Sequence, residues 1–338
     1  MADKKPAVTV VGAESLLGRE VVDVLGTQKF PADVKLVSGV EPDEPASAIL
    51  TEREGEPVFL TMLQAGEFIG SRAVLLAGAP WSSSKAAEVT SGLPKAPVLI
   101  DLTGVLEDSP AARLRAPMAE DSRPTPPAPI YVVAHPAAIV LAVFLKQLVK
   151  AAPMRRVVAQ VFEPVSERGK KGLDELQQQT VGLLSFQKLK KEVFDTQVSF
   201  NMLPAFGSEA LRSLEDVENT VDRHLATLLS SQPAIPLPSL RVVHAPVFHG
   251  YSFSLWIEFE SRPSVETIAA AIAGPRVDVR SKDEEPPSNV GVAGQSGVAV
   301  GSIVPDRNDP RACWFWIAAD NLRITADNAL EVARELFE

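Results

Sequence analysis

The chain has 338 residues, of which 46% are hydrophobic, 22% charged and only 6% aromatic. The apolar fraction excludes an intrinsically disordered chain, and the length allows one or two domains with sizeable cores. Lys and Arg number 33 against 43 Asp and Glu, a formal net charge of −10. This balance lacks the basic surface that a nucleic-acid partner requires.

The ends and apolar stretches of the chain predict its compartment. The first residues, Met1 to Pro6, lead directly into a strand-like stretch and lack the apolar core and cleavage site of a signal peptide. The longest apolar stretch, 130–145, is interrupted by His135 and Pro136, and it is shorter than the roughly 18 to 20 residues of a membrane span. We therefore expect a soluble, cytoplasmic protein with no membrane partner.

Strands alternate with helices in the first part of the chain. An apolar run at 7–11, then Gly12 and an amphipathic segment at 15–25, is typical of the start of a doubly wound α/β domain. Further predicted elements are strands at 34–37, 73–76, 98–101 and 130–133 and a helix at 82–90. This alternation indicates a parallel sheet. The proline-dense stretch 109–129 is expected to be a surface excursion without regular structure.

The second half has a different pattern. The predicted elements are a strand at 156–162, helices near 171–191 and 209–229, a last strand at 313–318 and a final helix at 321–337. Two alternating segments, 240–247 and 252–259, flank His249 and Gly250. Alternation with period two predicts an antiparallel sheet with one face covered. We expect an α+β domain.

The first candidate site is the turn Val11-Gly-Ala-Glu-Ser-Leu-Leu-Gly. A glycine at position 12 permits the tight turn of a dinucleotide-binding fingerprint. However, Ser15 stands where pyrophosphate would rest on the helix N-terminus, and the Glu14 carboxylate beside it would satisfy the N–H groups and the dipole that otherwise hold phosphate. Two interpretations stay open, a turn without ligand or a dinucleotide site made by Gly12, Ala13, Glu14, Ser15, Leu16 and Leu17.

An acidic stretch follows the second predicted strand. Its sequence is Ser38-Gly-Val-Glu-Pro-Asp-Glu, where enzymes that prefer NADP usually place an arginine near the ribose 2′-phosphate. The three acidic residues contact the ribose hydroxyls of NAD or form a solvated loop. The cofactor expectation is therefore NAD or NADP, with NADP disfavoured by charge, or no cofactor.

Four separated motifs carry a resemblance to a known family. They are Gly169-Lys-Lys-Gly-Leu-Asp-Glu-Leu, Asn201-Met-Leu-Pro, His244-Ala-Pro-Val-Phe-His-Gly-Tyr-Ser and Asp320-Asn-Leu-Arg-Ile-Thr-Ala-Asp-Asn-Ala. Over essentially its full length the chain resembles aspartate-semialdehyde dehydrogenases, and in particular the Usg-type homologues. The resemblance implies an NAD(P)-binding Rossmann-type domain over 1–135, an α+β dimerisation and catalytic-type domain over 136–313, and a C-terminal helix within 314–338 that returns to the first domain. It also implies a homodimer.

The same resemblance implies what the catalytic positions should hold. Family members act on L-aspartate-4-semialdehyde and aspartyl phosphate with NADPH, and they use a cysteine nucleophile, a histidine acid/base, an orienting glutamine and anion-binding arginines. In this chain the corresponding positions, in the same order, are Ala138, Tyr251, Glu163, and His244 with Glu107. A methyl group cannot form a thioacyl intermediate, and a phenol with a pKa near 10 is a poor proton shuttle. No catalytic residue of this reaction is therefore expected.

The remaining candidates are weaker. The resemblance adds Ser166 and Asn321 as cofactor contacts. The charged residues from Glu167 to Lys171 are expected to be a solvated helix start. Cys313 is expected to be a buried small hydrophobe, and His244 with His249 lack the convergent ligands of a metal site.

Three hypotheses for function follow. The first is a homologue that is inactive in the family's acyl-phosphate chemistry and has a binding, regulatory or assembly role, with a possible protein partner. The second is an NAD(P)-dependent oxidoreductase in which Tyr251 donates the proton and His244 or His249 lowers its pKa. The third is a structural partner that has lost all of its ligands.

Overall fold

The computed structural model describes residues 6–40, 50–53, 56–122 and 126–338. It divides into two compact units, Met1–Ala134 with Thr325–Glu338, and His135–Ile324. Among the described residues no helix is both long enough and apolar enough to cross a membrane.

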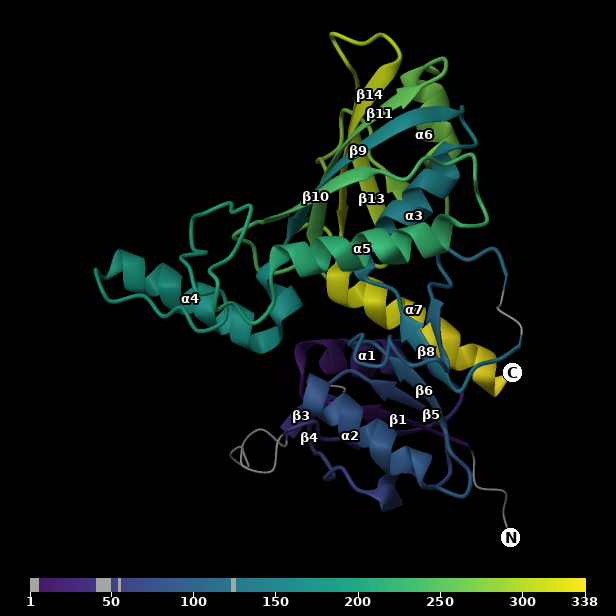
Figure 1. The fold of residues 1–338 in the computed structure, drawn as a ribbon, viewed down its shortest axis with the longest axis vertical. Coiled ribbons are helices and arrows are strands. Elements are labelled where there is room, and N and C mark those ends of the chain that lie inside the picture. The colour runs from purple at the N-terminus through teal and green to yellow at the C-terminus, as the bar shows by residue number, and fades with distance from the viewer. Residues whose placement is uncertain (1–5, 41–49, 54–55, 123–125) are drawn as a thin grey trace. The chain divides into compact units, whose positions relative to one another are not determined.

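The first unit is built on a six-stranded parallel sheet with the order β2-β1-β5-β6-β8-β7. Its elements are β1 (Ala7–Val11), α1 (Leu16–Thr27), β2 (Asp33–Val37), β3 (Leu50–Arg53), β4 (Glu56–Phe59), η2 (Ala65–Phe68), β5 (Ser71–Leu76), α2 (Pro80–Ser91), β6 (Val98–Asp101), β7 (Ala112–Arg115) and β8 (Ile130–Val133). All five residues of β1 are buried, as expected for a central parallel strand covered on both faces. The predicted doubly wound α/β architecture is confirmed (Figure 1).

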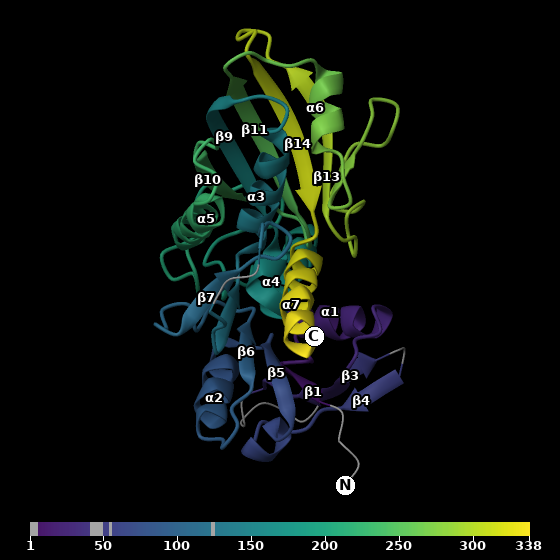
Figure 2. The same cartoon turned by 90° about the vertical axis from the view of Figure 1, so that its right-hand side faces the viewer.

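Helices cover this sheet on both sides (Figure 2). On one face, Val11, Val74 and Leu76 pack against Ala86 of α2. The C-terminal helix α7 (Asn321–Phe337) belongs to the first unit from Thr325 onward, as the expected return of this helix requires. Its Glu335 pairs at 3.0 Å with Arg115, whose side chain is 1% exposed and which lies 220 residues earlier in the chain.

One expectation for this unit was wrong. The proline-dense stretch 109–129 contains the strand β7, which pairs in parallel with β8 at the edge of the sheet. The strand is only four residues long, and short edge strands have no continuous apolar run that would mark them in the sequence.

The second unit contains a mixed six-stranded sheet with the order β10-β9-β11-β14-β13-β12. Its elements are α3 (Pro136–Leu148), β9 (Met154–Glu163), η3 (Val165–Arg168), α4 (Gly169–Leu184), α5 (Leu214–Leu229), β10 (Ser239–His244), β11 (Tyr251–Phe259), α6 (Val265–Ile272), β12 (Val277–Val279), β13 (Val298–Pro305) and β14 (Ala312–Ala319). The helices α3, α5 and α6 lie on one face of the sheet (Figure 1). Phe144 of α3, for example, packs edge-to-face on Phe315 of β14, with ring centroids 5.2 Å apart.

The pairing in this sheet differs from the prediction. The segments 240–247 and 252–259 are not neighbours, because β10 pairs in parallel with β9, and β11 lies between β9 and β14. A period-two pattern tells which face of a strand is buried but not which strand lies beside it. The helix expected near 171–191 ends at Leu184, and the helix expected from 209 begins at Leu214, after a capping box made by Ser213 and Asp216.

Candidate functional site

The turn after β1 brings three stretches of backbone into close approach in the first unit. Gly12 has a φ of +80°, and a Cβ on it would lie 2.1 Å from the Cα of Gly78. A Cβ on Gly39 would lie 2.9 Å from the Cα of Gly12. The three glycines follow β1, β2 and β5, which are adjacent in the sheet. The carboxyl ends of parallel strands are where open α/β sheets bind ligands.

The start of α1 is occupied by groups of the chain itself. The Ser15 hydroxyl accepts the N–H of Gly18 at 2.8 Å and donates to the Ala77 carbonyl at 2.7 Å. Oε1 of Glu14 accepts the N–H of Gly39 at 2.9 Å. A carboxylate therefore holds a backbone donor at the place where a phosphate would approach.

The other predicted residues of this unit have structural surroundings. The Ala13 carbonyl accepts the hydroxyl of buried Thr51 at 2.9 Å, and Leu16 and Leu17 form the half-buried first turn of α1. Glu107 is half-buried in a loop whose backbone is held by the carboxylate of Asp101. The acidic residues at 41, 43 and 44 lie outside the described residues.

A buried ion pair lies at the end of β9 in the second unit. Nη1 and Nη2 of Arg168 lie 2.9 and 3.3 Å from Oε1 and Oε2 of Glu163, a two-pronged contact. The side chains are 6% and 1% exposed. Burial raises the pKa of Glu163, and the Arg168 charge opposes that shift. The guanidinium also lies over the ring of Phe206, 5.4 Å from its centroid. Its two terminal nitrogens are paired with the carboxylate, whereas its buried Nε has no hydrogen-bond partner among the described residues.

Asn321 connects the start of α7 to this cluster. Its Nδ2 donates to Oε1 of Glu167 at 2.8 Å, and its Oδ1 accepts the N–H of Gly250 at 3.0 Å and the hydroxyl of Ser166 at 3.2 Å. The two residues predicted to contact a cofactor in this half, Ser166 and Asn321, therefore contact each other. Burial, reinforced by the neighbouring Glu163 charge, raises the pKa of Glu167 to about 7.

Tyr251 and His135 lie beside the acidic residues. Their ring centroids are 5.9 Å apart, and Nε2 of His135 lies 3.6 Å from Oε2 of Glu167. Burial lowers the pKa of His135 well below its ordinary value, and burial with the Glu167 and Glu163 charges raises that of Tyr251. Among the described residues the Tyr251 hydroxyl and Nε2 of His135 have no hydrogen-bond partner. The directions of the two pKa shifts make both groups neutral near pH 7.

Ala138 lies at the N-terminal end of α3 and is fully buried. The cysteine of the chain lies far along the sheet from Tyr251. On the paired strands β11 and β14, Tyr251 is opposite Ala319, whereas Cys313 is opposite Ile257. Six residues along a strand correspond to about 20 Å. Cys313 is buried as expected, and burial raises its pKa, so it is not an alternative nucleophile.

The two histidines considered for metal binding are not part of a ligand set. His244 packs against the rings of Phe194 and Phe206, with centroids at 5.8 and 5.4 Å, and burial lowers its pKa to about 4. His249 is half-buried in the loop before β11. Within the part of the chain that the structure describes, no three His, Cys, Asp or Glu side chains are grouped so that they could hold a metal ion.

The prediction of a solvated charge run at the start of α4 was half wrong. Lys170 and Lys171 are exposed, but the side chains of Glu167 and Arg168 are 14% and 6% exposed and belong to the buried cluster. Arg168, Glu167 and His135 were therefore not predicted as site residues. The available signal was the five-residue spacing from Glu163 to Arg168 across a turn, which lets opposite charges meet.

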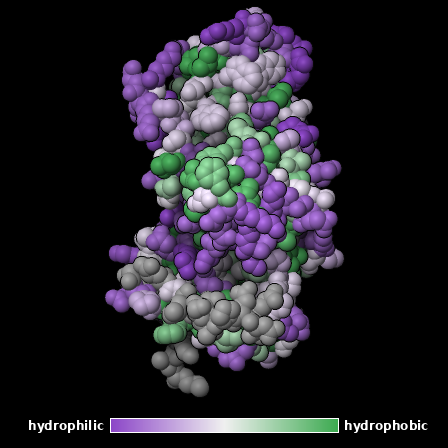
Figure 3. All heavy atoms as spheres, turned by 90° about the vertical axis from the view of Figure 1, so that its left-hand side faces the viewer, coloured by the Kyte–Doolittle hydropathy of each residue, from purple (hydrophilic) through white to green (hydrophobic). Residues whose placement is uncertain are grey.

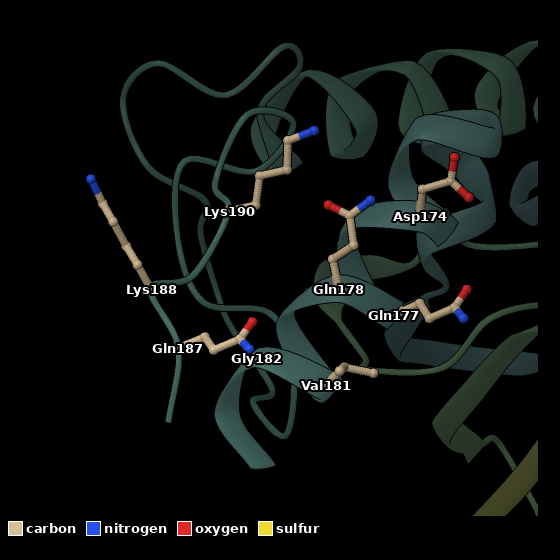
Figure 4. Close-up of a pocket in the computed structure, with 8 residues that line it drawn as sticks. All are labelled: Asp174, Gln177, Gln178, Val181, Gly182, Gln187, Lys188 and Lys190. Atoms are coloured by element: carbon tan, nitrogen blue, oxygen red, sulfur yellow. The ribbon is translucent and has the colours of Figure 1, made fainter. Parts of the chain in front are cut away.

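A separate cavity of about 430 Å³ lies along α4 (Figure 4). It is lined by Asp174, Gln177, Gln178, Val181, Gly182, Gln187, Lys188 and Lys190. None of the predicted site residues lines it. Its amide and ammonium groups give it a polar wall without a nucleophile or a paired acid and base.

Comparison with known proteins gives a consistent family. The family described as "Semialdehyde dehydrogenase, dimerisation domain" matches residues 145–324. The chain is 28% identical over 352 residues to an aspartate-semialdehyde dehydrogenase of Rickettsia bellii, covering 99% of this chain and 98% of that one. It is 26% identical over 336 residues to a USG-1 protein homolog of Azotobacter vinelandii, covering 98% and 97%.

Solved structures agree in fold. A probable aspartate-semialdehyde dehydrogenase from Pseudomonas aeruginosa superimposes with a TM-score of 0.83 at 24% identity, with 99% of each chain covered. An aspartate-semialdehyde dehydrogenase with NADP from Candida albicans superimposes with a TM-score of 0.65 at 15% identity, with 99% of this chain and 98% of that chain covered.

Proposed function

Since the chain belongs to the semialdehyde dehydrogenase family through its dimerisation domain, we propose that it is a homologue of aspartate-semialdehyde dehydrogenase that does not catalyse phosphate-dependent acyl transfer. Its role is binding, regulation or assembly, as a homodimer. The curated relatives include both aspartate-semialdehyde dehydrogenases and USG-1 homologues over nearly the whole chain, so similarity alone does not assign the reaction.

The observation that carries the proposal is the residue at the nucleophile position. We assign this position to Ala138, a buried residue at the start of α3 whose side chain is a methyl group. The helix N-terminus there would favour a thiolate, but alanine offers no atom that can attack an acyl group. Cys313 cannot take the place of the missing nucleophile at this site, because it lies about 20 Å along the sheet from Tyr251.

The surrounding charges support the same conclusion. We assign Glu163 to the position of the orienting glutamine, and its two carboxylate oxygens accept hydrogen bonds from Nη1 and Nη2 of Arg168. An anionic substrate would have to displace this buried pair, and leaving a buried charge unpaired costs about 3–5 kcal/mol. The ion pair therefore disfavours an anionic acyl phosphate in this part of the unit.

The alternative with Tyr251 as proton donor is not favoured. Burial raises the pKa of the phenol, the opposite of what proton transfer near neutral pH needs. The hypothesis had His244 or His249 lower that pKa, but His244 packs against two aromatic rings and burial lowers its own pKa to about 4.

The dinucleotide site fits its ligand only in backbone shape. The backbone at Gly12 approaches that of Gly78 as closely as a dinucleotide-binding turn requires. However, the Glu14 carboxylate before α1 accepts the Gly39 N–H, and its negative charge repels a pyrophosphate. We propose that Gly12, Ala13, Ser15, Leu16 and Leu17 are a retained turn and that tight binding of NAD or NADP is absent. NADP is the less favoured of the two because it carries one more phosphate.

Covalent trapping tests the proposal. The native chain and the variant Ala138→Cys are incubated with an acyl phosphate or with aspartate semialdehyde and analysed by intact mass and peptide mapping. We expect no stoichiometric adduct on the native chain. On the variant we expect a thioester at residue 138, formed with release of phosphate, and formed slowly because the Glu163–Arg168 pair disfavours the anion. Ala142→Cys, one turn further along α3 and equally buried, is the matched control and should stay unlabelled. A saturable adduct at any native residue would overturn the proposal.

A further inference from the structure

The exposed residues of 169–192 form a basic surface on an acidic chain. This stretch contains α4 and the loop after it, and most of its exposed charged residues are lysines, whereas the whole chain has a formal net charge of −10. Lys190 pairs with Glu192 at 3.0 Å, but within the described residues no acidic side chain pairs with Lys188. The exposed lysines are Lys170, Lys171, Lys188, Lys190 and Lys191. This stretch therefore attracts negative charge.

Buried side chains of α4 hold the loop in place. Oε2 of Glu175 accepts the N–H groups of Glu192 and Val193 at 2.7 and 2.6 Å. Nε2 of Gln179 donates to the Lys190 carbonyl at 2.8 Å. Glu175 and Gln179 are both buried, so water does not compete for these bonds. The loop backbone at Lys190 is therefore fixed beside α4 before any partner binds, which lowers the entropy cost of binding.

The cavity of about 430 Å³ lies between α4 and this loop (Figure 4). Its lining includes three glutamines and two lysines, namely Gln177, Gln178, Gln187, Lys188 and Lys190. A glutamine amide both donates and accepts hydrogen bonds, as peptide groups do, and an ammonium group donates to carboxylates. The volume lies within the range of about 300–1,000 Å³ that is typical of ligand sites. The lining therefore suits a short polypeptide segment that carries carboxylates.

An apolar ridge borders the cavity at the end of α4. Its residues Val181, Leu184 and Phe186 are 55%, 72% and 99% exposed, and Val181 also lines the cavity. Figure 3, which faces the side where α4 projects in Figure 1, shows apolar side chains (green) at mid-height with hydrophilic ones (purple) beside them. We call the ridge together with the lining of the cavity the α4 surface. A partner with both apolar and acidic side chains would match it.

The backbone of Phe186 is an independent sign that its ring has a partner. Phe186 has a φ of +55° and follows the C-cap Ser185, at the position where helices usually place glycine because other residues are strained there. The N–H groups of Gln187 and Phe186 bond to the carbonyls of Gly182 and Leu183 at 2.8 and 3.3 Å, the pattern of this kind of helix end. Burial of the ring does not offset the strain, since the ring is almost wholly exposed. Strain without a gain for the isolated chain indicates a role in binding.

We propose that the α4 surface binds a segment of another protein that is rich in Asp and Glu and carries a large apolar side chain. This apolar side chain packs on Phe186 and Leu184, and the carboxylates accept hydrogen bonds from Lys188 and the glutamine amides. The inference deepens the binding role of the proposed function and rests on it. A nucleic acid suits the surface less well, because its closely spaced phosphates are repelled by a chain with a net charge of −10.

Selection of peptides on the full chain tests the chemistry of the occupant. A displayed library of random peptides is incubated with the immobilised wild-type protein at low ionic strength. The soluble variant Lys188→Glu is present in excess, so that peptides that bind elsewhere on the chain are removed. We expect the enriched peptides to combine Asp or Glu with a large apolar side chain. Enrichment of basic peptides, or of none, would overturn the proposal.

Fluorescence anisotropy of one enriched peptide, synthesised with a fluorophore, then measures its affinity. Lys188→Glu should raise the dissociation constant about fivefold or more, because it replaces attraction by repulsion. Phe186→Gly should raise it about tenfold or more, and should raise the midpoint of thermal unfolding by about 1–2 °C because glycine relieves the backbone strain. Two exposed positions provide matched controls that should leave the affinity unchanged. They are Lys95→Glu in the first unit, for the charge, and Val290→Gly, for the apolar side chain.

Other outcomes overturn the inference. Wild-type affinity in both Lys188→Glu and Phe186→Gly would do so, as would a fall in the unfolding midpoint of Phe186→Gly, because the ring would then serve the fold. If oligodeoxythymidylate displaces the peptide better than polyglutamate, the occupant is a nucleic acid. If Phe186→Gly lowers the mass of the chain in sedimentation equilibrium, the occupant is a second copy.

Two controls complete the design. Circular dichroism verifies that the variants are folded, and Lys188→Gln decides if Lys188→Glu is misfolded. The covalent trapping result does not depend on any of these measurements, so failure of this inference and failure of the proposed catalytic inactivity are distinguishable.

Discussion

Replacing Glu14 should create the dinucleotide affinity that the turn after β1 lacks. In the native chain the Glu14 carboxylate lies 2.9 Å from the Gly39 nitrogen, at the start of α1. Glu14→Ser removes the charge and frees this N–H, while the glycine contacts beneath it remain. Glu14→Gln keeps an oxygen that accepts the Gly39 N–H and removes only the charge. Comparing the two variants therefore separates the repulsion between the carboxylate and a phosphate from the blocking of the Gly39 N–H by a side-chain oxygen.

The size of the effect follows from Coulomb's law. Two unit charges about 5 Å apart interact by about 3 kcal/mol at an effective dielectric constant of about 20. Glu14 is half-buried, so solvent screening reduces this to about 1.5–3 kcal/mol for one phosphate charge. We therefore expect NADH to bind Glu14→Ser about 10 to 100 times more tightly than the wild type.

Calorimetric titration with NADH and NADPH at low ionic strength measures this change. Asp23→Asn is the matched control, since it alters the net charge equally at an exposed position of the same helix, about 12 Å further along its axis. Equal affinities for the wild type and both Glu14 variants would refute the reasoning. So would micromolar binding by the wild type, because the carboxylate would then not exclude pyrophosphate.

Three further predictions concern the second unit. The pKa of Glu167 is about 7 in the folded chain against an ordinary 4.5, so its stabilising contribution is complete below pH about 4.5 and is lost as the pH rises through 7. Relative to Glu167→Gln, the wild-type free energy of unfolding should fall by up to about 3 kcal/mol between pH 5 and 8 in urea titrations, and parallel pH profiles would contradict this. Arg168→Met should lower the free energy of unfolding by about 3 kcal/mol and the double variant with Glu163→Gln should recover most of it, whereas additive losses would show that the two side chains do not interact. Ser213→Ala removes the capping box of α5 and should lower the free energy of unfolding by about 1 kcal/mol, measured by thermal unfolding. Ser208→Ala, at an exposed position, is the control and should leave this free energy unchanged.

Local patterns predicted much of the fold. The strands 98–101 and 130–133 and the helix 321–337 have the bounds expected from the sequence. Short apolar runs bounded by glycine, proline or polar residues fix such elements locally. The helix α3 was not identified, because eleven of its thirteen residues are buried and a helix that is apolar all round has no amphipathic period.

The candidate site was harder to predict because it depends on partners. Glu163 was expected to repel an anion and Arg168 to face solvent, and each expectation treated one residue alone. The chain turns between them through η3, so the two charges meet and are buried together. His135 was not predicted as a site residue, and its contact with Tyr251, with ring centroids 5.9 Å apart, depends on the fold of the second unit.

The pair between Arg115 and Glu335 has a consequence for biosynthesis. The two residues are 220 positions apart, and a ribosome adding roughly 5–20 residues per second needs about 10–40 s to cover that distance. During this interval the nascent first unit lacks α7 and its sequestered guanidinium lacks one of its two carboxylate partners, the other being Glu120. The first unit therefore completes this ion pair only after the last residues of the chain have been synthesised.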